Sequence, residues 1–189
     1  MNERAKTILN FWFKQTSNKK RFSKNEAFDQ KIRNSFLRDY QKATNNEYDN
    51  WQNNVDECLA LIILLDQFSR NLFRNNSKAF SMDNKAQQIA IGAIKKKYHE
   101  NLAQNKIIFI FLPFMHSEKL NDQVYCGKLI DTYLKKHSNY KDIKKYAQLH
   151  EDIIKKFGRF PYRNKVLKRK STKKEQEYLN SVHHDFFNI

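Results

Sequence analysis

Arginine, histidine and carboxylate residues gather beside aromatic residues in three segments of this 189-residue chain, 64–74, 111–123 and 150–164. Arginine is preferred over lysine where a planar carboxylate or phosphate is bound through two hydrogen bonds. Lys outnumbers Arg three to one in the chain, yet five of the nine Arg residues lie in or just after these segments: Arg70, Arg74, Arg159, Arg163 and Arg169. The segments are therefore the first candidates for a site that binds an anion.

The first segment places a carboxylate and two guanidinium groups at four-residue steps, as Asp66, Arg70 and Arg74. Residues spaced in this way share one face of a helix, with the carboxylate one turn before each arginine. One interpretation is a salt-bridged helix end that secures the helix to its neighbour. The other is an arginine-lined wall of a ligand site, and the residues alone leave both open.

The second segment carries His116 and Glu118 directly after Pro113, with Asp122 one turn beyond. We expect a new helix to open at Ser117, and unpaired N–H groups at a helix start favour a bound anion. Together with the histidine of the third segment, these groups have the types needed for general acid–base catalysis. A lone histidine is also often a hydrogen-bonded core or capping residue.

The third segment alternates arginine with aromatic residues after a glycine, in the loop 158–164. Such a loop can stack on bases or bind an anion. Alternatively, the aromatic rings plug the core while Arg159 and Arg163 hold carboxylates such as Asp66 or Glu118. The dipeptide Arg-Asn occurs here and in the first segment, which fits two similar turns that face one cleft.

The preferred hypothesis is a binding protein with a cleft for a small anionic ligand or an acidic peptide. The candidate ligand-binding residues are Asp66, Gln67, Arg70, Asn71, Arg74, His116, Glu118, Asp122, His150, Arg159, Arg163, Asn164 and Arg169.

A second hypothesis is a nucleic-acid-binding accessory protein that uses the basic segment 155–174. This segment holds ten Lys and Arg residues and no acidic residue, and clustered positive charges bind phosphates with release of counterions. The formal net charge of the chain is +16. Codon usage rich in A and T would also give a Lys- and Asn-rich surface, so the net charge by itself does not identify a partner.

A third hypothesis is a hydrolase that uses His116 or His150 with Glu118 or Asp122. The sequence has no glycine-rich phosphate loop, no nucleophile elbow and no metalloprotease helix. Neither a cofactor nor a metal is indicated, and whether the protein is an enzyme stays open.

The elements that position these segments are expected to be helices. Three Gly and two Pro residues leave few tight turns for hairpins or barrels. The apolar spacing predicts a single all-α domain over 1–189, a compact antiparallel helical-hairpin array of seven to nine helices. The predicted helices include an antiparallel pair at 8–13 and 28–36, a central one at 55–68, one at 83–98, one from 106 that Pro113 ends or kinks, one from Ser117, one at 143–157 capped by Gly158, and one at 172–181 that starts with a capping box.

The compartment is expected to be the cytoplasm. Cys58 and Cys126 lie in apolar stretches without metal-ligand spacing, which is typical of core residues in a reducing environment. The N-terminus lacks the apolar core of a secretory signal, and no apolar run reaches the length of a membrane span.

Four motifs in order, ILNFWF, LALIILLDQFSRNLFR, FLPFMHSE and FGRFPYRN, resemble those of a bacterial family, the domain of unknown function numbered nine hundred and twenty-four. The resemblance spans almost the whole chain. It implies a compact, tetratricopeptide-like helical fold and assigns no activity. This chain departs from the family pattern at Tyr162, where the family usually has His, and at Lys168, where a Gly commonly precedes the arginine that corresponds to Arg169.

Overall fold

The computed structural model describes residues 1–181, which form helices and connecting segments with no strand among them. Nine helices are present in these residues when the continuous helical stretch 55–72 is counted once, so the prediction of an all-α fold with seven to nine helices is confirmed. The chain divides into two compact units, Met1–Asn101 (unit 1) and a second that begins at Leu102 (unit 2). The single domain over 1–189 stays a prediction. Within residues 1–181, no helix is long and apolar enough to cross a membrane.

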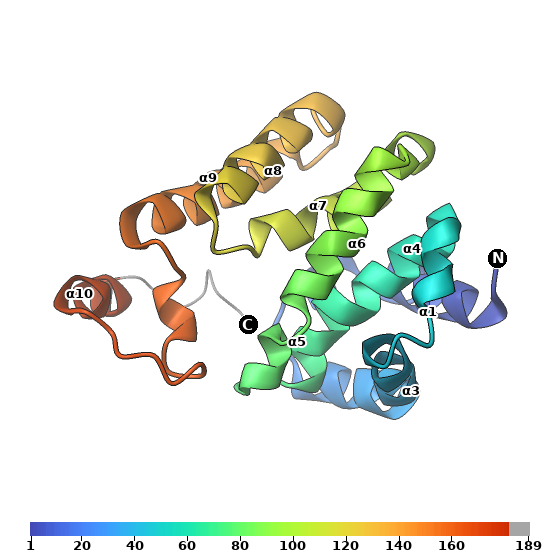
Figure 1. The fold of residues 1–189 in the computed structure, drawn as a ribbon, viewed down its shortest axis with the longest axis horizontal. Coiled ribbons are helices and arrows are strands. Elements are labelled where there is room, and N and C mark those ends of the chain that lie inside the picture. Colours follow the sequence, from blue (N-terminus) through green and yellow to red (C-terminus); the bar gives the residue numbers. More distant parts are fainter. Residues whose placement is uncertain (182–189) are drawn as a thin grey trace. The chain divides into compact units, whose positions relative to one another are not determined.

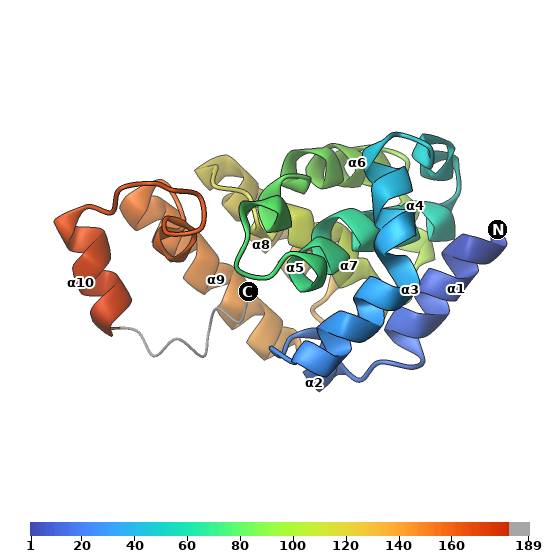
Figure 2. The same cartoon turned by 90° about the horizontal axis from the view of Figure 1, so that it is seen from below.

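Unit 1 begins with α1 (Glu3–Phe13) and α3 (Glu26–Thr44), joined through the short α2 (Asn18–Arg21). The end of α1 meets the start of α3, where the rings of Phe11 and Phe28 stack with centroids 5.9 Å apart. The start of α1 meets the end of α3, where the Arg4 guanidinium binds the Asp39 carboxylate. The two helices are therefore antiparallel, as the sequence predicts (Figure 2).

A continuous helical stretch forms the centre of unit 1. It consists of α4 (Val55–Ile62), a π-helical segment (Ile63–Phe68) and α5 (Ser69–Leu72), and all six residues of the π-helical segment are buried. The prediction of a central helix at 55–68 is confirmed. A π-helix widens the backbone and changes which residues share a face, so the four-residue steps from Asp66 do not describe a regular α-helical face.

Shorter elements complete unit 1 around this centre. The helix α6 (Asp83–Lys95) packs beside α4 (Figure 1). It ends earlier than the predicted boundary at residue 98, because the chain turns through Lys97 with a positive φ of 59°. Three 3₁₀ helices connect the longer elements: Asp49–Asn53, Ser77–Phe80 and Tyr98–Asn101.

Unit 2 is built from three consecutive packed helices, α7 (Gln104–Met115), α8 (Leu120–Tyr133) and α9 (Tyr140–Phe157). A 3₁₀ turn (Pro161–Arg163) and α10 (Lys173–Ser181) follow. Helix α7 does not end at Pro113 but continues to Met115, and His116 N–H still bonds to the Leu112 carbonyl. Pro113 cannot donate a hydrogen bond to the Phe109 carbonyl, and the helix ends two residues after it.

The predicted start of the next helix at Ser117 is wrong, because α8 begins at Leu120. The Ser117 hydroxyl accepts from the Lys119 N–H and donates to the Asp122 carboxylate at 2.6 Å, which fixes an extended connection before the helix. His116 is therefore the C-cap of α7, and Glu118 lies in the connection. Neither residue forms the helix N-terminus that the sequence analysis expected.

Both predicted caps near the end of unit 2 are confirmed. Gly158 follows α9 in the left-handed conformation (φ 69°), and its N–H bonds to the Ile154 carbonyl at 2.8 Å. At the start of α10, the Thr172 N–H donates to Glu175 at 2.7 Å and the Glu175 N–H donates to the Thr172 hydroxyl at 3.2 Å. These two bonds are the reciprocal pair of a capping box.

Candidate functional site

The thirteen candidate ligand-binding residues fall into two groups. Unit 1 holds those of the first segment, and unit 2 holds those of the second and third segments together with Arg169. The contacts of each group are described within its own unit. The prediction that the two groups line one cleft remains a prediction.

Arg70 and Arg74 both bind carboxylates of neighbouring elements in unit 1. Arg74 makes two hydrogen bonds to Asp29 of α3, at 2.6 and 2.8 Å, and the Asn71 amide donates to the same carboxylate at 2.8 Å. Arg70 pairs with Asp83 of α6 at 2.7 Å and donates to the Ala79 carbonyl. These contacts favour the salt-bridge interpretation for both arginines, with acids from α3 and α6 as the partners.

Asp66 and Gln67 lie in the π-helical segment and are buried. The Gln67 amide donates to the Asp66 carboxylate at 2.5 Å, and the Ser69 hydroxyl donates to the Asp66 carbonyl at 3.0 Å. π-Helical segments often occur at functional sites, so this buried polar turn stays among the candidates.

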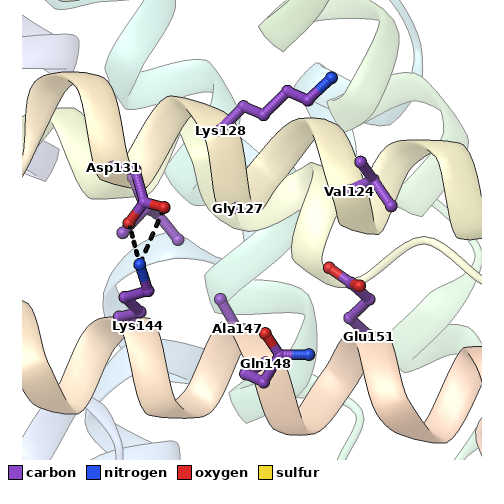
Figure 3. Close-up of a pocket in the computed structure, with 9 residues that line it drawn as sticks. Val124, Gly127, Lys128, Asp131, Lys144, Ala147, Gln148 and Glu151 are labelled. Carbon is purple, nitrogen blue, oxygen red and sulfur yellow. Dashed lines mark hydrogen bonds and ion pairs between the residues drawn. The ribbon is translucent and has the colours of Figure 1, made fainter.

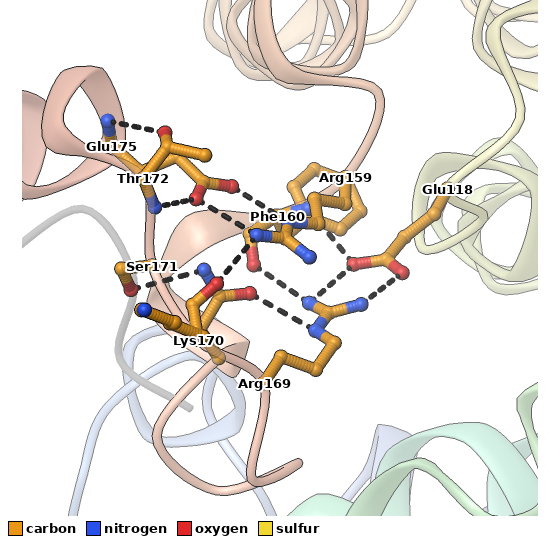
Figure 4. A network of polar contacts seen from close by, with 9 residues as sticks. Glu118, Arg159, Phe160, Arg169, Lys170, Ser171, Thr172 and Glu175 are labelled. Atoms are coloured by element: carbon orange, nitrogen blue, oxygen red, sulfur yellow. Dashed lines mark hydrogen bonds and ion pairs between the residues drawn. The ribbon is translucent and has the colours of Figure 1, made fainter.

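A polar network in unit 2 is centred on Glu118 and Arg169 (Figure 4). Arg169 binds both oxygens of Glu118, at 2.6 and 2.9 Å, and the Phe160 N–H donates to Glu118 at 2.8 Å. The guanidinium also donates to the Phe160 carbonyl at 3.0 Å and to the Asn164 side chain at 2.9 Å. The carboxylate in the α7–α8 connection thereby holds the loop that follows α9.

Burial alone would raise the pKa of Glu118, but the hydrogen bonds from Arg169 and Phe160 and the charges of Arg163 and Arg169 lower it below its usual value. The carboxylate is therefore ionised at neutral pH, with both oxygens already hydrogen-bonded. Asp122 accepts a hydrogen bond from the Ser117 hydroxyl. Glu118 is thus poorly suited to proton transfer, which weighs against the hydrolase hypothesis.

Arg159 anchors the start of α10 in the same way. It makes two hydrogen bonds to Glu175, at 2.6 and 2.8 Å, and donates to the Lys170 carbonyl at 2.9 Å. The hydrogen bond from Arg159 lowers the pKa of Glu175 to about 2, and the Thr172 N–H adds to the effect. The sequence analysis considered Asp66 or Glu118 as the carboxylate that Arg159 holds, whereas the hydrogen-bonded partner is Glu175.

Basic side chains gather around Phe160, whose ring is fully buried. The guanidinium of Arg163, which is 4% exposed, lies over this ring at 4.5 Å, and the ring of His150 meets it edge-on at 5.4 Å. Nδ1 of His150 bonds to the Tyr146 carbonyl at 2.8 Å. Burial lowers the pKa of His150 to about 4, and the charges of His116 and Arg163 act in the same direction. His116, His150 and Arg163, called here the basic cluster, therefore lie within electrostatic range of one another.

The partners of the arginines were missed by sequence reasoning. Asp29 and Arg74 are 45 positions apart, and Glu118 and Arg169 are 51 apart. No local periodicity links residues so distant in the chain. The sequence singled out Glu118 as a candidate carboxylate and Glu175 through the capping box, but it paired neither acid with the arginine that it binds.

A pocket of about 210 Å³ lies between α8 and α9 of unit 2 (Figure 3). The salt bridge between Asp131 and Lys144, at 2.8 Å, crosses it, and Val124, Gln148 and Glu151 line the rest. None of the predicted ligand-binding residues lines this pocket. Among residues 1–181, no group of three or more His, Cys, Asp or Glu side chains is placed to hold a metal ion.

Lys168 occupies a backbone conformation that normally favours glycine, with φ of 55°. A side chain in this left-handed region costs about 1 kcal/mol. The Arg169 N–H that follows bonds to the Asn164 carbonyl at 2.8 Å, so the tight turn sets the position of Arg169. This geometry gives a physical reason for the glycine that the resembling family commonly has at the position of Lys168.

Comparisons with known proteins agree with the motifs. No curated protein matches the chain. A solved structure, a protein of unknown function, ATU0120, from Agrobacterium tumefaciens, is similar over 94% of this chain and 97% of its own, with 33% identity and a TM-score of 0.87. The family model described as "Bacterial protein of unknown function (DUF924)" matches residues 8–182. The chain therefore belongs to the bacterial family DUF924.

Proposed function

We propose that this protein binds a small anionic ligand, one with carboxylate or phosphate groups such as an acidic peptide terminus, and that the basic cluster of unit 2 holds it. The observation that carries the proposal is that Arg163 and His150 both contact the Phe160 ring, while His116 lies close enough to His150 for its charge to act on that ring. The charge of Arg163 disfavours protonation of His150, and an anion that joins the cluster would offset this repulsion.

Glu118 does not take the place of the proposed anionic ligand. Both oxygens of Glu118 are bound by Arg169, and one also accepts from the Phe160 N–H. Arg169 neutralises the charge of Glu118, whereas Arg163 adds positive charge that affects both Glu118 and His150.

Binding is expected to depend on pH through His150. The bond from its Nδ1–H to the Tyr146 carbonyl leaves Nε2 as the acceptor nitrogen of the neutral ring. An anion next to the ring favours protonation of Nε2 and raises the pKa of His150. Affinity should therefore rise as the pH falls from about 7 toward 5, with uptake of one proton on binding.

Thermal unfolding tests the proposal with phosphate, sugar phosphates, nucleotides, dicarboxylates and acidic peptides at physiological salt. A ligand at a hundredfold its Kd stabilises the folded state by about 2.7 kcal/mol. The shift should disappear in Arg163→Gln and persist in Arg70→Gln, which removes a similarly buried guanidinium from unit 1. If both variants retain the ligand-dependent shift in unfolding temperature, a site at the basic cluster is contradicted. If Arg70→Gln also loses the shift, the result favours the cleft predicted from the sequence, which includes Arg70.

The cytoplasmic location and the tetratricopeptide-like arrangement of the helices are also part of the proposal. Cys58 and Cys126 are free and buried, which supports a reducing cytoplasm. The consecutive packing of α7, α8 and α9 supports a helical-hairpin array of the tetratricopeptide kind.

A further inference from the structure

Lysine and arginine behave differently in the basic segment 155–174. The seven lysines are all exposed and are called here the lysine surface: Lys155, Lys156, Lys165, Lys168, Lys170, Lys173 and Lys174. The three arginines turn toward the protein, where Arg159 and Arg169 bind carboxylates and Arg163 is buried against Phe160. The fold therefore uses the arginines internally and leaves the lysines to face solvent.

The acids that hydrogen-bond to this segment are already paired with its arginines. The segment itself contains no Asp or Glu. Glu118 and Glu175 bind Arg169 and Arg159, respectively, at distances between 2.6 and 2.9 Å (Figure 4). As far as residues 1–181 are concerned, the positive charge of the lysine surface is therefore available to an external partner.

Three lysines, at two places in the segment, work against the stability of the fold. Lys168 has a positive φ, where glycine would be unstrained. Lys173 and Lys174 occupy the first turn of α10, where the positive end of the helix dipole favours acidic residues. Neither placement helps the fold, so both point to a role for these charges outside it.

The segment that carries these lysines is held in a defined shape. The Asn164 amide donates to the Ser171 hydroxyl at 3.1 Å, and the side-chain oxygen of Asn164 accepts from Arg169 at 2.9 Å. Arg159 donates to the Lys170 carbonyl. A partner that binds the lysines therefore meets charges whose backbone positions are already fixed, which lowers the entropic cost of binding.

We propose that the lysine surface binds the phosphate backbone of double-stranded nucleic acid without sequence specificity. Lysine contacts phosphate as a point charge, whereas base readout relies mainly on the planar donors of arginine, and the arginines here face inward. The aromatic residues of the region, Phe157, Tyr162 and Tyr178, pack against Ile153, Ile154 and Phe160. This packing disfavours the base stacking that single strands require.

A membrane surface fits this region less well than a nucleic acid. The large apolar side chains exposed within residues 1–181 lie elsewhere, at Met1, Phe22, Leu120, Val124, Tyr125 and Tyr146. Stable attachment to a bilayer usually needs an apolar anchor in addition to basic residues. Within residues 1–181 the basic segment has no exposed apolar anchor of its own, and charge of this kind matches a phosphate backbone.

The test measures binding of the full chain to a labelled duplex of about 20 base pairs by fluorescence anisotropy, at salt concentrations between about 50 and 200 mM. A protein that neutralises several phosphates loses orders of magnitude in affinity over this interval. The quadruple variant Lys165→Gln, Lys168→Gln, Lys170→Gln and Lys173→Gln should bind at least about tenfold more weakly. Its slope of log affinity against log salt should become less negative by about 0.9 for each phosphate that the protein no longer neutralises.

A control variant removes the same charge from another part of unit 2, through Lys135→Gln, Lys136→Gln, Lys141→Gln and Lys145→Gln, all of which are exposed. It should retain affinity to within about threefold, because distant surface charges are largely screened at these salt concentrations. Equal losses in the two variants would overturn the proposal, as would tighter binding to anionic phospholipid vesicles or to single-stranded oligonucleotides. Circular dichroism checks that both variants are folded.

Discussion

Arg169 and Glu118 are 51 positions apart in the sequence, yet their side chains are joined by two hydrogen bonds, at 2.6 and 2.9 Å. The pair connects the segment between α7 and α8 to the loop that follows α9. Because Glu118 also accepts from the Phe160 N–H, the pair determines where Phe160 lies. Phe160 in turn contacts His150 and Arg163, so the geometry of the basic cluster depends on this one ion pair.

Replacement of Glu118 should destabilise unit 2. Glu118→Gln keeps the size of the side chain but leaves Arg169 without its carboxylate, and hydrogen bonds to charged groups contribute about 1.5–3 kcal/mol. Urea unfolding should show a loss in this range. Glu177→Gln, at an exposed position on α10, is the matched control and should change the free energy of unfolding by less than about 0.5 kcal/mol. Equal effects of the two changes would show that the pair does not anchor the loop.

Asp29 should be the corresponding anchor of unit 1. Asp29→Asn weakens both hydrogen bonds from Arg74 and the one from Asn71, so we expect a loss of about 2 kcal/mol in the free energy of unfolding. Glu26→Gln removes an acid from the same first turn of α3 and therefore controls for the helix dipole. A loss as large for Glu26→Gln as for Asp29→Asn would mean that the dipole, rather than the ion pair with Arg74, accounts for the effect.

The low pKa of His150 makes stability depend on pH. The folded-state pKa, about 4, lies below the ordinary value of 6.5, so the unfolded chain binds the proton more tightly. The free energy of unfolding should therefore fall as the pH drops from about 6.5 toward 4, by up to about 3 kcal/mol over the full interval. His150→Gln should reduce this dependence between about pH 7 and 5, and the part that remains comes from His99, whose pKa is also lowered by burial.

The pH range is chosen to separate His150 from the carboxylates. The pKa of Glu175 is lowered from 4.5 to about 2, so its contribution to stability is lost only as the pH falls below about 4.5. Histidine NMR signals of the native protein check the assignment directly. A ring at position 150 that titrates at the ordinary histidine value would contradict its burial and its basic neighbours.

Lys168 should be a position where glycine stabilises the fold. Lys168→Gly relieves a side chain in the left-handed region, which costs about 1 kcal/mol, although glycine also makes the unfolded chain more flexible. We expect a net gain of up to about 0.5 kcal/mol in thermal or urea unfolding. Lys165→Gly, in the same loop but outside the left-handed region, should instead lower stability. A loss in both variants would show that the strain at Lys168 is negligible.

Local signals in the sequence were enough to identify the fold class and most of the helices. The low number of glycines can be counted directly. Apolar residues at helical spacing and capping residues interact over only three or four positions, so these patterns can also be read from the sequence. The αL cap at Gly158 and the capping box of Thr172 and Glu175 are as predicted. The four ordered motifs also identified the family. The helix that Pro113 was expected to end or kink runs on to Met115. The predicted start at Ser117 was wrong, because the serine hydroxyl bonds ahead of α8 instead of at its start.

Which charges meet depends on the tertiary structure. Arg74 binds Asp29, Arg70 binds Asp83, Arg159 binds Glu175 and Arg169 binds Glu118. The sequence marked these arginines as unusual but did not name their partners, because ion pairs between distant segments depend on how the helices pack and leave no periodic trace in one chain. The same packing turns the arginines of the segment 155–174 inward and leaves its lysines in water, a division that composition cannot reveal because both residues carry the same charge.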